Sequence, residues 1–155
     1  MPSVFADTAL TPIAAPPKPS SSRARNVMRS NRSVSALEIA LRSELHRRGM
    51  RFRKNAIIPG LRCRPDIVFP RVRVAVECRG CFWHLCPEHA VLPKSNVEYW
   101  IPKLERNVER DRRNELALAD AGWKLAVVWE HEDAAHAASR IERLLRSATL
   151  AGRPR

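Results

Sequence analysis

The sequence predicts a mixed α/β fold, in which helices flank a mixed β-sheet. Short apolar runs bounded by turn residues alternate with segments of helical periodicity, in the order α-β-β-β-α-β-α. Apolar residues make up 45% of the 155 residues, which is enough for one ordinary hydrophobic core. Gly49 and Gly122 lie where helices should end, and Pro59-Gly60 separates two of the strand-like runs.

The first predicted helix begins near Ser35 and ends before Gly49. Ser35 and Glu38 have the spacing of a capping box, in which two side chains satisfy free backbone N–H groups of the first turn. Apolar residues at helical spacing predict its buried stripe: Val34, Leu37, Leu41 and Leu45.

Four short runs have the composition of β-strands. They cover residues 50–58, 65–69, 72–77 and 123–129. A loop rich in cysteine, histidine and tryptophan follows the third run. The fourth run, WKLAVVW, predicts a buried strand whose two tryptophans, Trp123 and Trp129, belong to the core.

Two further helices are predicted, over residues 97–121 and 134–145. Pro102 fits only the first turn of the longer helix, because proline lacks the N–H that an interior position needs. The expected buried stripe of this helix consists of Ile101, Leu104, Val108, Leu116 and Ala119.

Composition divides the chain into three parts. Residues 1–22, rich in Ala, Pro and Ser, are predicted to form a disordered tail. Residues 23–148 are the predicted folded domain, which opens with a basic segment over 23–32 that is either an arm along a phosphate backbone or a solvated linker. Residues 149–155 are predicted to be a basic C-terminal tail.

The chain is strongly basic, with 28 Lys+Arg against 16 Asp+Glu and a formal charge of +12. Such an excess favours a polyanionic partner, since neutralising phosphates releases counterions. A basic surface that serves solubility is the alternative. No apolar stretch approaches the roughly 20 residues that span a bilayer. The N-terminus also lacks the pattern of a secretory signal, so we expect a cytoplasmic protein that does not bind membranes.

The densest chemical motif is a run of thiol and imidazole side chains within residues 78–89. Ligands at such short gaps are typical of a tetrahedral zinc site. Local spacing favours one closed set of four ligands: Cys78, Cys81, Cys86 and His89. His131, far along the chain, is a further candidate, and buried free thiols beside incidental histidines are the alternative to a metal site.

A second motif resembles the active-site pattern of metal-dependent nucleases. Asp66 opens one strand, and Glu77-Cys78-Arg79 ends the next. Carboxylate and carbonyl oxygens at these positions could hold Mg²⁺ against a scissile phosphate. Arg79 is a poor substitute for the usual lysine, because its guanidinium is a planar fork rather than a compact charge. Glu38, which the capping box already explains, is a further carboxylate candidate.

The long helix and the cysteine-rich loop carry candidate DNA contacts. Asn107 and Asp111 are four residues apart and share a face, and the neighbouring arginines can reach phosphates. A solvated charged face is the alternative. Phe82, Trp83 and Trp100 are either core residues or wedges that stack between bases.

Five motifs together resemble the very short patch repair (Vsr) mismatch endonucleases. They are Pro65-Asp66-Ile-Val, Gly80-Cys-Phe-Trp-His84, Glu98-Tyr-Trp100, Asn107-Val-Glu-Arg-Asp-Arg-Arg113, and Gly122-Trp followed by Val-Val-Trp-Glu130. The resemblance covers about residues 25–132, in the same order and at nearly the same spacing. It implies a restriction-endonuclease-like fold and a monomeric bacterial enzyme. That enzyme would nick double-stranded DNA 5′ to the T of a T:G mispair left by deamination of 5-methylcytosine.

The resemblance also implies roles for individual residues. Asp66 is the magnesium carboxylate, and Cys78 supplies a backbone carbonyl to the same ion. His84 is similar to the catalytic histidine that acts on water, and Asp111 to its carboxylate partner. Glu38 aligns with an acidic residue of the active site, a role that is compatible with capping. Cys78 stands where several relatives carry a hydroxyl or carboxylate side chain.

Residues that contact DNA are implied in the same way. Phe82, Trp83 and Trp100 correspond to aromatics that wedge into the duplex beside the mispair. Lys103 and Asn107 correspond to residues that contact the mispaired bases, and Met28 corresponds to one that enters from the minor groove. The implied structural zinc ligands are Cys81, Cys86, His89 and His131, which leaves Cys78 free.

Two other functions are compatible with these residues. An unselective magnesium-dependent nuclease of the same fold would use Asp66 and His84 without an aromatic wedge. A non-catalytic zinc module would bind DNA and tolerate the loss of both residues. The aromatic and Asn-Asp motifs favour mismatch nicking.

Overall fold

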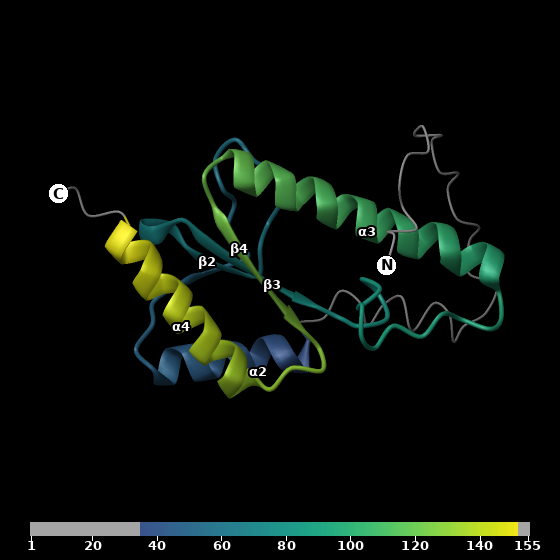
Figure 1. Ribbon diagram of the computed structural model, residues 1–155, viewed down its shortest axis with the longest axis horizontal. Helices are drawn as coiled ribbons and strands as arrows, with labels where there is room; N and C mark the ends of the chain where they lie inside the picture. Colours follow the sequence, from purple (N-terminus) through teal and green to yellow (C-terminus); the bar gives the residue numbers. More distant parts are fainter. Residues whose placement is uncertain (1–34, 152–155) are drawn as a thin grey trace.

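A computed structural model describes residues 35–151 of the chain. The predicted tail over residues 1–22, the basic segment over 23–32 and Met28 lie outside the described residues. In chain order the elements are α2 (Ala36–Arg47), β1 (Arg53–Lys54), β2 (Ile67–Phe69), the 3-10 helix η1 (Pro70–Val72), β3 (Val74–Arg79), α3 (Val97–Asp120), β4 (Lys124–Trp129) and α4 (Ala134–Ala151) (Figure 1).

The four strands form one mixed sheet in the order β1-β2-β3-β4. Antiparallel pairing joins β1 to β2 and β2 to β3, whereas β3 and β4 are parallel from Val74↔Lys124 to Arg79↔Trp129. A parallel pair needs a crossover connection, and α3 provides it. The predicted mixed sheet with flanking helices is thereby confirmed.

Helices cover both faces of the sheet: α2 and α4 lie on one side and α3 on the other (Figure 1). Alternate residues of β3 therefore enter different cores. Val74 and Val76 pack with α2 and α4, while Ala75 packs with Leu118 of α3. By the same alternation Glu77 and Arg79 lie on the α3 side, where the acidic side chains of α3 can reach them.

The buried stripe of α3 differs from the predicted one. Val108 and Leu116 are 39% and 57% exposed, whereas Leu104, Asp111 and Leu118 are buried. These three buried residues are seven apart, so they share one face. The middle member is an aspartate, and a stripe inferred from apolar residues alone is therefore rotated away from the true one. Pro102 lies in the second turn rather than the first, and the helix continues through it.

Two further boundaries differ from the prediction. The strand expected over residues 50–58 is limited to Arg53–Lys54, because the chain turns at Asn55 with a φ of 45°. Helix α4 runs on to Ala151, past the predicted end at residue 145 and into the segment that composition assigns to a basic tail. The two strand tryptophans, Trp123 and Trp129, are only half-buried.

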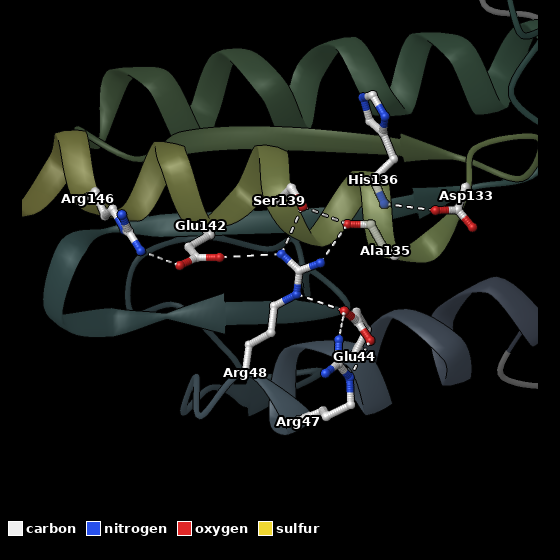
Figure 2. Close-up of polar contacts among 9 residues, drawn as sticks. All are labelled: Glu44, Arg47, Arg48, Asp133, Ala135, His136, Ser139, Glu142 and Arg146. Atoms are coloured by element: carbon white, nitrogen blue, oxygen red, sulfur yellow. Dashed lines mark hydrogen bonds and ion pairs between the residues drawn. The ribbon is translucent and has the colours of Figure 1, made fainter.

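Arg48, which follows α2, ties that helix to α4 (Figure 2). Its Nε donates to Glu44 Oε1 at 2.8 Å, and its two terminal nitrogens donate to Ser139 Oγ and to the Ala135 carbonyl, each at 2.9 Å. Glu142 Oε2 lies 3.3 Å from Nη1. This network joins the two helices on the side of the sheet that lies opposite α3.

None of the helices within residues 35–151 combines the length and the apolar character that crossing a membrane requires.

Candidate active site and metal centre

Strands β2 and β3 bring Asp66 and Cys78 together. Asp66 immediately precedes β2, and its Oδ2 accepts a hydrogen bond of 2.7 Å from the backbone N–H of Cys78. Burial raises the pKa of Asp66, although the hydrogen bond from Cys78 opposes this effect. Burial and the neighbouring Asp66 also raise the pKa of the Cys78 thiol to about 12, so this thiol stays protonated at neutral pH.

Glu38 joins this site from the first turn of α2. Its backbone N–H donates to Ser35 Oγ at 3.1 Å, so the predicted serine cap is present. The Glu38 side chain is buried and forms an ion pair with Arg42, whose Nη2 donates to the Asp66 carbonyl at 3.2 Å. Burial and the charge of Asp66 raise the pKa of Glu38. Glu38 therefore takes part in the cap of α2 through its backbone N–H and lies in the site through its side chain.

His84 faces Asp111 across the site. The backbone N–H of His84 donates to the Gly80 carbonyl at 3.1 Å, which folds the loop after β3 back toward α3. Nδ1 of His84 contacts Oδ2 of Asp111, whose residue is only 6% exposed. A carboxylate in this position holds Nδ1 as the protonated nitrogen and leaves Nε2 as the acceptor.

Arg79 and Glu77, at the end of β3, lie beside this pair. Arg79 Nη2 donates to Glu77 Oε2 at 2.7 Å, and burial raises the pKa of Glu77. Arg79 Nη1 lies 2.6 Å from Glu115 Oε1 of α3. Arg79 therefore does not project freely as the lysine of the nuclease pattern would.

Two adjoining clefts open on these residues, with volumes of about 830 and 500 Å³. Both are lined by Asp66, Cys78, Arg79, His84 and Arg110. The larger cleft continues past basic side chains, at Arg62, Arg64 and Arg113. The smaller cleft continues toward α2 and the aromatic loop, at Glu38, Trp83, Lys103 and Asn107. The predicted site residues of four distant segments thus line one continuous depression.

The loop after β3 gathers soft metal ligands. The Sγ atoms of Cys81 and Cys86 lie 3.2 and 3.7 Å from Nδ1 of His131. The ligand atoms of all three side chains lie within 4.8 Å of one another, and the His89 ring stacks 4.0 Å from the His131 ring. Two sulfur and two imidazole donors suit Zn²⁺. Among the described residues, Cys78 is not part of this group of ligand atoms, so the set based on local spacing alone differs from the one that the structure brings together.

An aromatic cluster adjoins the smaller cleft. Trp83 and Trp100 have ring centroids 5.6 Å apart, and Phe82 packs edge-on against both. Lys103 Nζ lies 5.4 Å from the Trp83 ring, and burial lowers the pKa of this lysine. Asn107 Nδ2 donates to the Trp83 carbonyl at 3.1 Å.

Gly80 lies close to Trp83 where this loop begins. A Cβ at Gly80 would stand 3.1 Å from Cδ1 of Trp83, so a larger residue would require the indole ring to shift slightly.

Comparison with known proteins places these residues in a family. The family model described as DNA mismatch endonuclease Vsr matches residues 19–88. The Type II nicking enzyme V.NaeI of Lentzea aerocolonigenes is 46% identical over 122 residues, which are 77% of this chain and 74% of that protein. The DNA mismatch endonuclease Vsr of Escherichia coli is 38% identical over 112 residues, which are 70% of this chain and 69% of that protein.

The chain belongs to the Vsr family. It is therefore a DNA endonuclease, as the sequence motifs predict. A further relative, the Type II nicking enzyme V.XorIIP of Xanthomonas oryzae pv. oryzae, is 47% identical over 116 residues, which are 71% of this chain and 81% of that protein.

Several polar residues of this Vsr-family site were not predicted from the sequence. Arg42 lies four residues after Glu38, and Glu115 lies four residues after Asp111, so helical spacing alone could have found both. Arg62 and Arg64 lie in an irregular segment before β2, where no periodicity indicates which side chains face the cleft.

Proposed function

We propose that this Vsr-family endonuclease nicks duplex DNA 5′ to the T of a T:G mispair that arises from deamination of 5-methylcytosine, and so initiates very short patch repair. The observation that carries the proposal is the His84–Asp111 pair, which faces Asp66 across a cleft beside clustered tryptophans. The His84–Asp111 pair and Asp66 support a role in hydrolysis. The clustered tryptophans support recognition of a weakened base pair.

His84 is the proposed general base. Its Nδ1–H is held by Asp111, so Nε2 takes the proton from the water that attacks the phosphodiester. Asp111 keeps the ring oriented and favours the charged imidazolium that forms. The neighbouring Arg110 provides positive charge for the flanking phosphates.

Asp66 and the backbone carbonyl of Cys78 are the proposed ligands of Mg²⁺. Their hard oxygen atoms fit this ion, and because burial raises the pKa of both Asp66 and Glu38, a neighbouring cation would stabilise their ionised forms. When bound, Mg²⁺ supplies positive charge that stabilises the transition state at the scissile phosphate. The Cys78 side chain is a neutral thiol and is not needed as a ligand.

Zn²⁺ is the proposed structural ion, held by Cys81, Cys86, His89 and His131. The chemistry of the donor set supports this assignment. The ion would join the loop after β3 to the end of β4. It would thereby fix the loop that carries His84 together with Phe82 and Trp83 of the aromatic cluster.

Phe82, Trp83 and Trp100 are the proposed wedge, with Lys103 and Asn107 as contacts to the mispaired bases. Inserting an aromatic ring between bases costs stacking energy, and a mispair reduces that cost because its stacking and pairing are already weak. The partly desolvated Lys103 beside three aromatic rings can bind a base or a phosphate at the entry point. One chain supplies all of these groups, so we expect a monomer.

The test is a nicking assay on an end-labelled duplex with one T:G mispair, beside matched T:A and C:G duplexes. Each duplex is incubated with zinc-loaded protein, with and without magnesium. We expect a magnesium-dependent cut of one strand, 5′ to the mispaired T. Equal cutting of all three duplexes would identify an unselective nuclease, and binding without any cut would identify a DNA-binding module.

A further inference from the structure

Arg79 is a buried cation at the centre of the site. Its side chain is only 8% exposed, and carboxylates of β3 and α3 surround it. Nη2 lies 2.7 Å from Glu77 Oε2, and Nη1 lies 2.6 Å from Glu115 Oε1. Nε lies 3.2 Å from the same Glu77 oxygen and 4.0 Å from Asp111 Oδ2.

The Asp111 oxygen that faces Arg79 is the one that contacts His84. Without Arg79, the buried Glu77 and Asp111 would be two nearby negative charges with no cation between them, and their repulsion would turn the Asp111 carboxylate away from its present position. A reoriented Asp111 could no longer hold His84 as a base. The other Asp111 oxygen lies 3.6 Å from Arg110, but that side chain is 53% exposed and solvent weakens its effect.

A carboxylate contacts each nitrogen of the guanidinium, which leaves two of its five N–H groups for another partner. All three of its nitrogens are directed at Glu77 or Glu115, and the planar fork matches both acids at once. Glu77 Oε2 in turn accepts two of these contacts. Arg79 therefore does not replace the lysine of the nuclease pattern, and Glu77 has a partner that competes with a metal ion.

We propose that Arg79 is a positioning residue, which holds Asp111 directed at His84, and that Glu77 is its counterion rather than a magnesium ligand. This inference rests on the proposed role of His84 as the base. Arg79 and its glutamate partners would support the reacting groups without contacting the substrate, and they come from both sides of the interface between β3 and α3.

The first test compares Arg79→Gln, Asp111→Asn and the double variant in single-turnover nicking of the T:G duplex. We expect Arg79→Gln to lower the nicking rate about 100-fold, with the Kd for the duplex changed less than about threefold. Because Arg79 acts through Asp111, the double variant should be no slower than Asp111→Asn alone. A double variant whose loss of rate equals the product of the two single losses would overturn the proposal.

Arg79→Lys and Arg48→Gln serve as matched variants. Lysine keeps a charge near Asp111 without the fork, so we expect it to recover about tenfold of the lost rate. Arg48 is a partly buried arginine with two glutamate partners on the far side of the sheet, and its replacement should leave nicking by the folded protein unchanged. Equal losses in Arg48→Gln and Arg79→Gln would reduce Arg79 to a structural role and contradict the proposal.

Glu77→Gln gives an answer even where Arg79→Gln fails to fold. If Glu77 is a counterion, its replacement should lower the nicking rate by less than about tenfold. The magnesium concentration for half-maximal nicking should stay within about threefold of the wild-type value. A rise of more than about tenfold in that concentration would make Glu77 a metal ligand and overturn the assignment.

A spectroscopic measurement separates this inference from the proposed function. In nitrogen-15 spectra of the full chain without magnesium or DNA, His84 should show the single tautomer with its proton on Nδ1. Arg79→Gln should give a mixture of tautomers, and an unchanged His84 signal would overturn the positioning role. A wild-type chain that fails to nick would contradict the proposed function alone.

Discussion

Two arginine-glutamate networks on opposite sides of the sheet use similar chemistry for different ends. Arg48 connects α2 to α4 through Glu44 and Glu142, and none of these residues lines the two clefts of the site (Figure 2). Arg79 connects β3 to α3 through Glu77 and Glu115, and lines both clefts. The first network holds helices together, and the second surrounds the groups that we propose act on the substrate.

The carboxylates of the two regions differ in their electrostatic balance. Side-chain hydrogen bonds from Arg47 and Arg48 lower the pKa of Glu44 to about 2, so its negative charge favours the folded state. Burial raises the pKa of Glu38, Asp66 and Glu77, so their negative charges oppose folding at neutral pH. The comparison indicates that these three carboxylates are maintained at a cost in stability, which fits the catalytic site proposed above.

The largest effect should come from His84→Ala. Removing the proposed base should lower the nicking rate about 1,000-fold, while the melting temperature stays near that of the wild type because the side chain is not part of either core. Rates are measured under single-turnover conditions on the T:G duplex. Retention of a tenth or more of the rate would remove His84 from the mechanism.

The next largest effect should come from the loop after β3, which carries three of the proposed zinc ligands. Cys86→Ala should abolish stoichiometric zinc binding and lower the free energy of unfolding by at least about 3 kcal/mol, because a structural ion contributes directly to folding. Zinc content is measured by atomic absorption. Cys63→Ala is the matched control, since Cys63 is equally buried but lies in the core beside α3, and it should keep its zinc. Full zinc content in Cys86→Ala would contradict the proposed ligand set.

Arg48→Gln should lower the free energy of unfolding by less than Cys86→Ala does, because Glu44 and Glu142 lose their shared partner but keep their ion pairs with Arg47 and Arg146. Urea denaturation measures this loss. The nicking rate of the folded variant should stay within about twofold of the wild type. A folded variant that nicks much more slowly would show that the Arg48 and Arg79 networks are coupled. It would contradict the assignment of a purely structural role to Arg48.

Much of the architecture could be predicted from local sequence. The Ser35 cap and the Leu41–Leu45 stripe of α2 follow from helical spacing, and the structure confirms both. The stripe of α3 could not be predicted in this way, because the buried position between Leu104 and Leu118 is occupied by Asp111. A buried charged residue thus interrupts the apolar pattern that identifies a core.

The site was predictable only in part. Motifs identified Asp66, His84 and Asp111 as candidates, and the structure brings them to one depression. Local spacing favoured Cys78 for the zinc set, whereas the structure groups Cys81 and Cys86 with the distant His131, which the β3–β4 pairing brings to the loop. The contacts of Arg79 with α3 likewise depend on packing that no short motif encodes.

The most direct test of the contrast between the two regions is one variant measured in two ways. Asp66→Asn keeps an oxygen that accepts the Cys78 N–H but removes the buried charge. Because the folded-state pKa of Asp66 lies above its ordinary value of 3.8, ionisation opposes folding as the pH rises through the folded-state pKa. The variant should therefore be more stable than the wild type at neutral pH, and the difference should vanish below about pH 3.8.

Melting of the zinc-loaded protein without magnesium, together with nicking of the T:G duplex with magnesium, gives both values. We predict that Asp66→Asn melts a few degrees higher at pH 7, which corresponds to roughly 1 kcal/mol in a domain of this size, and no longer nicks. An Asp66→Asn variant that melts lower at pH 7, or that still nicks, would contradict the conclusion that this charge is kept for catalysis at the expense of stability.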